Sequence, residues 1–280
     1  MAQDKYKAVW VSHSSMGDFL KCPRAYFLHN VYKDPKTKRK INLVSPALAL
    51  GVSVHEVVEG LANYKAEERF KQPLLEQYEK AWQKISGKAG GFKSEADELE
   101  AKNRGKEMIL RVMKNPGPLV NKALKLKNGQ NDMPPNFFLS EEENIILCGK
   151  IDWLEYVPED DSVRVLDFKT GKNEESGESL QLPIYQLLLN KLQKRKVSGA
   201  SYWYLDKDDV PIPVALPSVE DSYKRVIEVA RQVKKAREAG VYACPRGEGG
   251  CFACKPFEKI LKGEAEYIGV GEYNQDLYMM

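Results

Sequence analysis

The 280-residue sequence predicts a single elaborated domain of the α/β class, an α+β variant in which a central mixed sheet is flanked by helices. A chain of this length is long for one ordinary domain and short for two, which favours one domain with insertions. Residues 136–170 contain short apolar runs rich in aromatic and β-branched residues, a pattern typical of strands. The segments on both sides repeat apolar residues every three or four positions, as amphipathic helices do.

The N-terminal half predicts two helices and an insert. Residues 12–32 begin with serines suited to an N-cap and continue in a helical rhythm that a proline interrupts. Residues 47–70 predict a second helix with His55 and Glu59 on one face, because residues four apart are neighbours on a helix. Residues 72–135 are largely helical and polar, so we expect an insert there that serves as a lid or an arm.

The C-terminal half predicts the core. Two antiparallel strands joined by the turn 158–161 are followed by a strand at 199–206. Helices are expected at 179–195 and 218–240, the second with a serine cap and a closing glycine. Within one domain we distinguish an N-terminal helical segment with the first cysteine, the insert, the core, and a cysteine-rich loop with an irregular tail, at residues 12–45, 72–135, 136–240 and 241–280.

Charge is informative locally rather than globally. Lys and Arg total 43 against 40 Asp and Glu, and this net charge of +3 argues neither for nor against a polyanionic partner. Residues 101–130 contain eight Lys or Arg and only Glu107 as an acid, and residues 32–40 add five basic residues against Asp34. Such patches suit a phosphate backbone, and equally a solvated helix face or a flexible loop.

Composition also bears on compartment and cysteine chemistry. No apolar run has the length of a signal peptide or of a membrane span, so we expect a cytoplasmic protein without membrane contact. Five cysteines without an export signal argue against a disulfide framework and leave metal binding or free thiols. Cys148 lies in an apolar strand and is interpreted as a buried thiol.

Two aspartates stand out in the predicted strands. Asp152 and Asp167 would meet at one edge of the sheet, where hard carboxylate oxygens hold Mg²⁺ or Mn²⁺ with positions open to water and phosphate. Lys169 would share the face of Asp167, because strand side chains alternate, and its charge would steady a phosphoryl oxygen. The alternative interpretation is an exposed strand face with an ordinary charge pair.

Four motifs widen this pattern: "GVSVH" ending at His55, "GKID" ending at Asp152, "DFK" at 167–169 and "QLPIY" at 181–185. Their types and order resemble the RecB-like branch of the PD-(D/E)xK nuclease superfamily, over residues 12 to 257. The resemblance implies a restriction-endonuclease-like core and a metal-dependent nuclease. It also implies metal ligands at His55, Asp152, Asp167 and the carbonyl of Phe168, and catalytic residues at Asp152, Asp167, Lys169, Gln181 and Tyr185. Glu59 is interpreted as a solvated helix residue or, alternatively, as a partner of His55.

A second pattern joins the two ends of the chain: Cys22, Cys244, Cys251 and Cys254. Four converging cysteines are able to ligate a 4Fe-4S cluster or, alternatively, zinc, and would staple the domain closed; fully reduced thiols are a third interpretation. The pattern is similar to the iron-sulfur staple of the AddB nuclease domain and of the CRISPR-adaptation nucleases. Here the long gap, C-x6-C, precedes C-x2-C, the reverse of the order usual in those families.

The resulting expectation is a DNA nuclease, an exonuclease or end-trimming enzyme for single-stranded or splayed DNA, in repair, recombination or CRISPR adaptation. The sequence has no phosphate-binding loop of the "GxxxxGK[ST]" type, so the chain carries no motor of its own. Either it works alone on DNA ends, or it supplies the nuclease to a partner such as a helicase or a CRISPR integrase. Arg24, Tyr26 and Lys172 are candidate DNA contacts. Two alternatives stay open: a DNA-binding module with little cleavage of its own, and a redox protein that uses the cluster, although no "GxGxxG" fingerprint is present.

Overall fold

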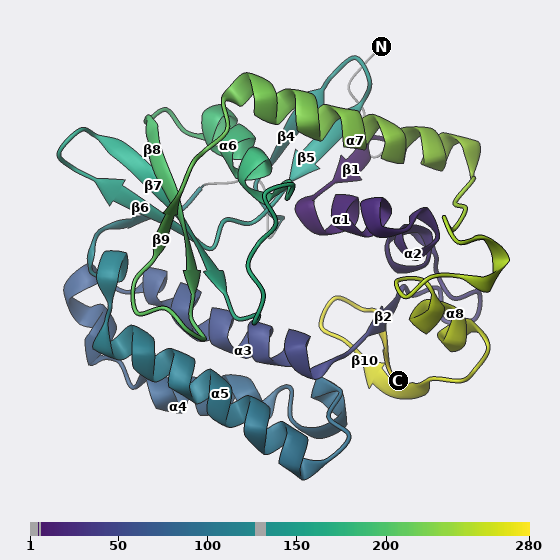
Figure 1. The fold of residues 1–280 in the computed structure, drawn as a ribbon, viewed down its shortest axis with the longest axis horizontal. Helices are drawn as coiled ribbons and strands as arrows, with labels where there is room; N and C mark the ends of the chain where they lie inside the picture. The colour runs from purple at the N-terminus through teal and green to yellow at the C-terminus, as the bar shows by residue number, and fades with distance from the viewer. Residues whose placement is uncertain (1–4, 6, 127–132) are drawn as a thin grey trace.

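The computed structural model describes residues 5, 7–126 and 133–280 and confirms a mixed α/β architecture. Its central five-stranded sheet is mixed, since β6 and β7 are antiparallel whereas β7 and β8 are parallel (Figure 1). In spatial order the strands are β3 (Ala123–Leu124), β6 (Trp153–Val157), β7 (Ser162–Lys169), β8 (Val197–Tyr204) and β9 (Ile212–Val214).

The central strand β7 brings the two aspartates to one edge. Six of its eight residues are buried, and Asp167 is one of them although it carries a carboxylate. Trp153 is opposite Leu166 in the antiparallel register, so Asp152, just before β6, and Asp167, next along β7, lie at the same edge. Strand alternation then decides which face each side chain meets.

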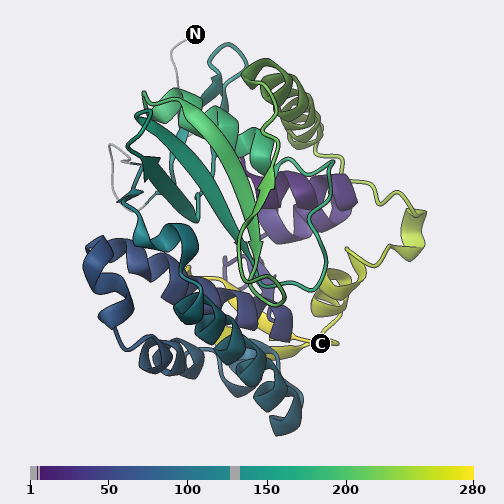
Figure 2. The ribbon, with the colours of Figure 1, turned by 60° about the vertical axis from the view of Figure 1, so that its left-hand side comes forward.

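Helices cover both faces of this sheet. The helices on one face are α3 (Pro46–Gly60), α4 (Leu74–Gln83) and α5 (Glu95–Lys114), and those on the other are α1 (His13–Lys21), α6 (Gln181–Leu192) and α7 (Val219–Ala239). In both views α4 and α5 lie against α3, away from α1 and α7 (Figure 2). Leu166 and Phe168 face the first layer, whereas Val163 and Val165 face the second.

The expectation that residues 72–135 form a lid or an arm is wrong. Trp82 and Met108 are buried in the same core as Phe168 and Trp203, because α4 and α5 supply apolar faces that cover the sheet. The segment also contributes a strand, β3, which pairs with β6 at the sheet edge. Residues 127–132 of this segment lie outside the described residues.

Two small sheets complete the chain. The first joins β1 (Val9–Val11), β5 (Ile145–Cys148) and β4 (Asn136–Ser140), and the second joins β10 (Glu266–Val270), β11 (Asp276–Met279) and β2 (Ile41–Leu43). The C-terminal tail is therefore a hairpin and not irregular, as the sequence led us to expect. Buried Asp276 accepts a hydrogen bond from Thr37 at 2.5 Å, which helps tie this hairpin to the basic loop 32–40.

The predicted breaks and caps are confirmed. α1 ends before Cys22, and α2 (Pro23–Tyr26) starts at the proline, which is tolerated there because a first-turn residue needs no amide hydrogen. α7 ends at Gly240, whose φ of 66° is the left-handed conformation that glycine adopts most easily. The remaining helices are η1 (Phe27–Val31), η2 (Leu61–Asn63), η3 (Ala66–Lys71), η4 (Gly87–Gly90), η5 (Gly117–Val120), η6 (Gly247–Gly249) and α8 (Lys255–Leu261). None of the described helices has the length and apolar character needed to span a membrane.

Candidate active site

Helix α3 supplies two side chains to the acidic edge of the sheet. Ser45 caps the helix, and one turn separates His55 from Glu59, so both point to the same side. His55 Nδ1 lies 2.9 Å from Glu59 Oε1 and 3.6 Å from Asp152 Oδ2. One ligand atom from each of these three residues falls within 4.8 Å of the others. They form a compact set that we call the acidic triad.

Glu59 is the main correction to the predicted site. The side chain is only 13 % exposed, so the solvated-helix interpretation is wrong. Its second carboxylate oxygen forms an ion pair with Lys150. Burial raises the pKa of Glu59, but hydrogen bonds from His55 and Lys150 outweigh it and leave the pKa below its ordinary value. Glu59 therefore stays anionic beside the imidazole.

The surroundings of Asp152 both favour and oppose its ionised form. Its Oδ2 accepts a hydrogen bond from the Phe168 amide at 3.0 Å. Burial, together with the charge of Asp167, nevertheless raises the pKa of Asp152 to about 7. Burial lowers the pKa of His55, but its bond to Glu59 and the nearby carboxylates raise it above the ordinary value. A bound cation would relieve this concentration of negative charge.

Asp167 is the centre of a second set, on the α6 side of the sheet. Its Oδ1 accepts hydrogen bonds from Tyr185 at 2.9 Å and from Gln181 Nε2 at 2.7 Å. Lys169 Nζ lies 2.8 Å from Asp167 Oδ2 and donates to Gln181 Oε1. The "DFK" and "QLPIY" motifs thus meet, as their predicted roles require, because β7 and α6 face each other across the edge of the sheet.

The donor set fits a hard divalent cation. Asp167 Oδ2 is buried and accepts no hydrogen bond of ordinary geometry among the described residues, although Lys169 Nζ stands 2.8 Å away as a charge partner. Such an oxygen is suited to a metal, and the acidic triad adds two carboxylates and an imidazole. Asp167 itself is not part of the compact triad, and ligation by Asp167 and by the Phe168 carbonyl stays a prediction.

Glu175 is a residue of this site that no sequence pattern predicted. Its Oε2 lies 3.1 Å from Lys169 Nζ, so the lysine stands between two carboxylates. Burial lowers the pKa of Lys169, and Asp167 and Glu175 outweigh it, which keeps the ammonium charged. Glu175 sits in the polar loop before α6, where no periodicity marks it.

A motif glycine permits this close assembly. A Cβ at Gly149, in "GKID", would lie 3.0 Å from Leu188 Cδ1 of α6. A larger residue would require the end of the Leu188 side chain to move by a few tenths of an ångström. The glycine thus lets the segment before Asp152 pack closely on α6.

The four predicted cysteines converge near the junction of α1 and α2. One sulfur from each lies within 4.8 Å of the others, with Cys254 Sγ 3.8 Å from Cys251 Sγ and 3.7 Å from Cys244 Sγ. Cys22, Cys251 and Cys254 are buried, and none of the five cysteines is in a disulfide. Burial raises the pKa of Cys22 to about 12. The fifth, Cys148, stands apart in β5, and burial raises its pKa to about 11.

The three candidate DNA contacts lie in different environments. Tyr26 is 1 % exposed and packs between Phe19 and Tyr242, so its ring offers almost no surface to a base, and a DNA contact by Tyr26 stays a prediction. Arg24 is ion-paired with Glu258 at 2.6 Å, close to the cysteines. Lys172 is exposed in the loop after β7, and contact with DNA stays a prediction for it.

The basic segment 101–130 is less free than its composition indicates. Arg104 pairs with Asp206 at 2.8 Å, Arg111 pairs with Asp209 at 3.0 Å, and Lys102 pairs with Glu79. These cations help to join α5 to its neighbours. The fraction of the charge that is available to a phosphate backbone is correspondingly smaller.

Comparison with known proteins adds one finding. A family model described as the PD-(D/E)XK nuclease superfamily matches residues 10–257, which is most of the chain. The match includes the acidic triad, the Asp167 set and all four converging cysteines. It stops before the C-terminal hairpin of β10 and β11. No curated protein matches the sequence.

Proposed function

The chain belongs to the PD-(D/E)XK nuclease superfamily, and on that premise we propose that it is a Mg²⁺- or Mn²⁺-dependent deoxyribonuclease that acts at single-stranded or splayed DNA ends. Membership of this superfamily indicates a metal-dependent nuclease and hence a hydrolase. The observation that carries the proposal is the convergence of the acidic triad with the Asp167 set at one sheet edge.

The metal would be held by His55, Asp152 and Asp167, with Glu59 as a ligand or as the partner that orients His55. A divalent cation bound there would lower the pKa of a coordinated water and draw charge from the phosphate oxygens. The protein's part is to hold its own carboxylates in position. Tyr185 and Gln181 do so for Asp167 by occupying Oδ1, which leaves Oδ2 facing the cation and Lys169.

Lys169 would stabilise charge on the scissile phosphate. It is held from three sides, by Asp167, Glu175 and Gln181, and these partners leave the ammonium little freedom to reorient. A donor fixed before the reaction stabilises developing charge without any reorganisation of its surroundings. The raised pKa of Lys169 means that it serves as a cation rather than as a base at neutral pH.

For the cysteine cluster we propose a 4Fe-4S cluster, with zinc as the alternative, held by Cys22, Cys244, Cys251 and Cys254. Either cofactor would link the four cysteines at this spacing. A visible absorption spectrum distinguishes the two cofactors, as does iron and sulfide analysis of anaerobically purified protein. We further propose a cytoplasmic setting, which keeps thiols reduced, and a helicase or an integrase as partner in repair, recombination or CRISPR adaptation.

The test is cleavage of end-labelled single- and double-stranded DNA in Mg²⁺, Mn²⁺ or EDTA, with wild type beside Asp167→Ala. We expect metal-dependent cleavage that the variant loses. Asp160→Ala, in the exposed turn between β6 and β7, is the matched control and should keep full activity. DNA binding without cleavage in any of the metals would overturn the proposal in favour of a binding module.

A further inference from the structure

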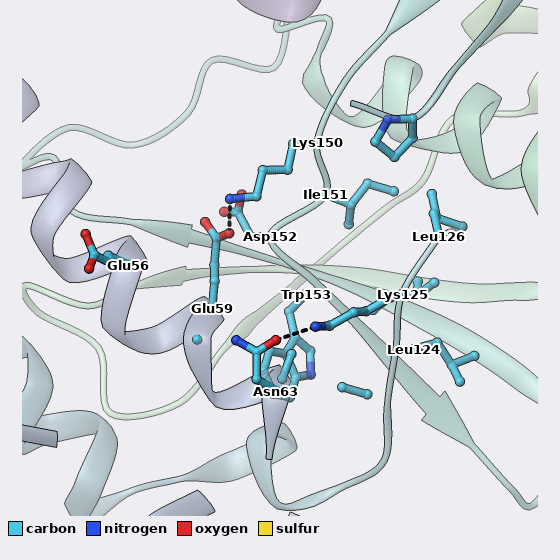
Figure 3. Close-up of a pocket in the computed structure, with 15 residues that line it drawn as sticks. Glu56, Glu59, Asn63, Leu124, Lys125, Leu126, Lys150, Ile151, Asp152 and Trp153 are labelled. Carbon is cyan, nitrogen blue, oxygen red and sulfur yellow. Dashed lines mark hydrogen bonds and ion pairs between the residues drawn. The ribbon is translucent and has the colours of Figure 1, made fainter. Parts of the chain in front are cut away.

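A cavity of about 470 Å³ adjoins the acidic triad where β3 pairs with β6 (Figure 3). Glu59 and Asp152 line one side of it, so the cavity begins at the candidate metal ligands. The close-up shows Leu124, Leu126 and Ile151 on the opposite side. Known sites for small organic ligands measure about 300 to 1,000 Å³, so one nucleoside has room here.

The lining has two chemical halves. Leu124, Leu126 and Ile151 are partly buried and present an apolar wall. At the lower end of the view, Asn63 Oδ1 accepts a hydrogen bond from Lys125 Nζ at 2.5 Å. Apolar walls with a few placed polar groups are what organic ligands bind, and a nucleobase with its sugar combines both kinds of surface.

Lys150 connects the cavity with the acidic triad. Its ammonium forms an ion pair with Glu59, and its side chain lines the cavity and is 72 % exposed. If Glu59 turns its charge toward a cation, the Lys150 ammonium is released to a phosphate beside the cavity. A chain that leaves the metal centre in this direction would meet a cation first and an apolar wall next.

We propose that this cavity holds the nucleoside next to the scissile phosphate, with its base against Leu124, Leu126 and Ile151. The inference rests on the proposed function and deepens it. A base inside the cavity is out of reach of a complementary strand, so the substrate must be unpaired at that nucleotide. The cavity would thus be the reason for a preference for single-stranded or splayed ends.

The test combines an altered substrate with an altered cavity. Single-stranded oligonucleotides that carry one abasic residue at successive positions are cleaved under single-turnover conditions in Mn²⁺. We expect one position next to the cleaved bond at which loss of the base slows wild type by roughly tenfold, as for one base contact. In Ala62→Phe, which fills the cavity from η2, the intact strand should be slowed and the abasic penalty should vanish.

Two further variants guard against a folding artefact. Leu126→Ser keeps the volume open but weakens the apolar wall, so it should reduce the abasic penalty without abolishing cleavage. Ala239→Phe places the same ring on the exposed end of α7 and should behave as wild type. An unchanged abasic penalty in folded Ala62→Phe would overturn the inference, as would an equal rate for intact and abasic strands in wild type.

A binding measurement separates this inference from the proposed function. Anisotropy of a labelled oligonucleotide with Asp167→Ala in Ca²⁺ reports the affinity without cleavage. A Kd that is roughly tenfold higher for the abasic strand than for the intact strand supports the cavity even if wild type cleaves nothing. This difference in Kd should disappear when Ala62→Phe is added. If the intact and the abasic strand bind with equal affinity both to Asp167→Ala and to the protein that also carries Ala62→Phe, the cavity proposal is overturned even if wild type is an active nuclease.

Discussion

The acidic centre and the cysteine cluster both gather side chains from distant segments, but they are held in different ways. In the acidic centre, protein groups hold the side chains: Asp167 has Tyr185 and Gln181, and Asp152 has the Phe168 amide. In the cysteine cluster Cys254 Sγ lies 3.8 Å from Cys251 Sγ and 3.7 Å from Cys244 Sγ, and the proposed cofactor would link the sulfurs. The first site is organised by the fold, whereas we expect the second to depend on the proposed cofactor.

Because of this difference, we expect substitutions in the acidic centre to affect mainly activity and substitutions in the cysteine cluster to affect mainly stability. Loss of a carboxylate charge should leave the sheet edge standing, because neighbouring hydrogen bonds and the two cores remain. Loss of a cysteine would remove the proposed link between residue 22 and residues 244–254, which are far apart in the sequence. The Arg24–Glu258 ion pair and the stacking of Phe27 on Tyr242 are protein contacts that would remain between these parts of the chain.

The largest effect should come from Asp167→Asn. The amide keeps the shape and can still accept from Tyr185, but the charge that faces the cation and Lys169 is gone. We expect cleavage to fall by roughly 10³-fold, the upper range for one stabilising group, with little change in the midpoint of thermal unfolding. Gel assays and circular dichroism measure both. A variant that unfolds would contradict the view that the fold organises this site.

Cys22→Ser tests the other half of the comparison. Losing a native cross-link typically costs about 2–5 kcal/mol, and the variant should lose its cofactor and become protease-sensitive in residues 241–280. Denaturant unfolding and limited proteolysis measure these changes. Cys148→Ser, in β5 outside the cluster, is the control and should retain the cofactor. Equal stability of Cys22→Ser and wild type would mean that the cluster is no staple.

Glu59→Gln should weaken the metal site by roughly 10- to 100-fold in affinity, the range for a partner that orients a ligand. The physical reason is the lost charge beside His55, at 2.9 Å. Calorimetry with Mn²⁺ measures the affinity. Glu56→Gln is a close control, because Glu56 lies on the same helix but pairs with Lys84 in solvent. If the two variants bind Mn²⁺ alike, Glu59 has no part in the site.

The smallest effect, of opposite sign, should appear in Asp152→Asn without metal. Burial and the charge of Asp167 oppose ionisation of Asp152, so removing its charge should stabilise the metal-free protein by about 1 kcal/mol. Thermal unfolding in EDTA measures this, with Asp160→Asn as the exposed control. Added Mn²⁺ should reverse the order by stabilising wild type more. A destabilised variant in EDTA would show that the Phe168 hydrogen bond outweighs the repulsion.

Helices, strands and motif residues were predictable because their signals are local. The apolar rhythm of 218–240, its serine cap and its final glycine predicted α7 closely. The order of four short motifs predicted which side chains meet, as seen for Lys169 and Gln181. Four cysteines at the two ends predicted a cluster. These features can be predicted without the tertiary structure because the hydrophobic period and the chemistry of the residues are properties of the chain itself.

Packing between distant segments decided the rest. The exposure of a helix residue depends on what covers it, so Glu59 became a buried partner of His55 and Tyr26 became part of a core. Glu175 reaches Lys169 only because the loop before α6 folds back to β7. Strands as short as β2 and β11 carry too few residues for a periodic signal and exist because they pair with each other. The cavity beside the acidic triad likewise arises from the pairing of β3 with β6.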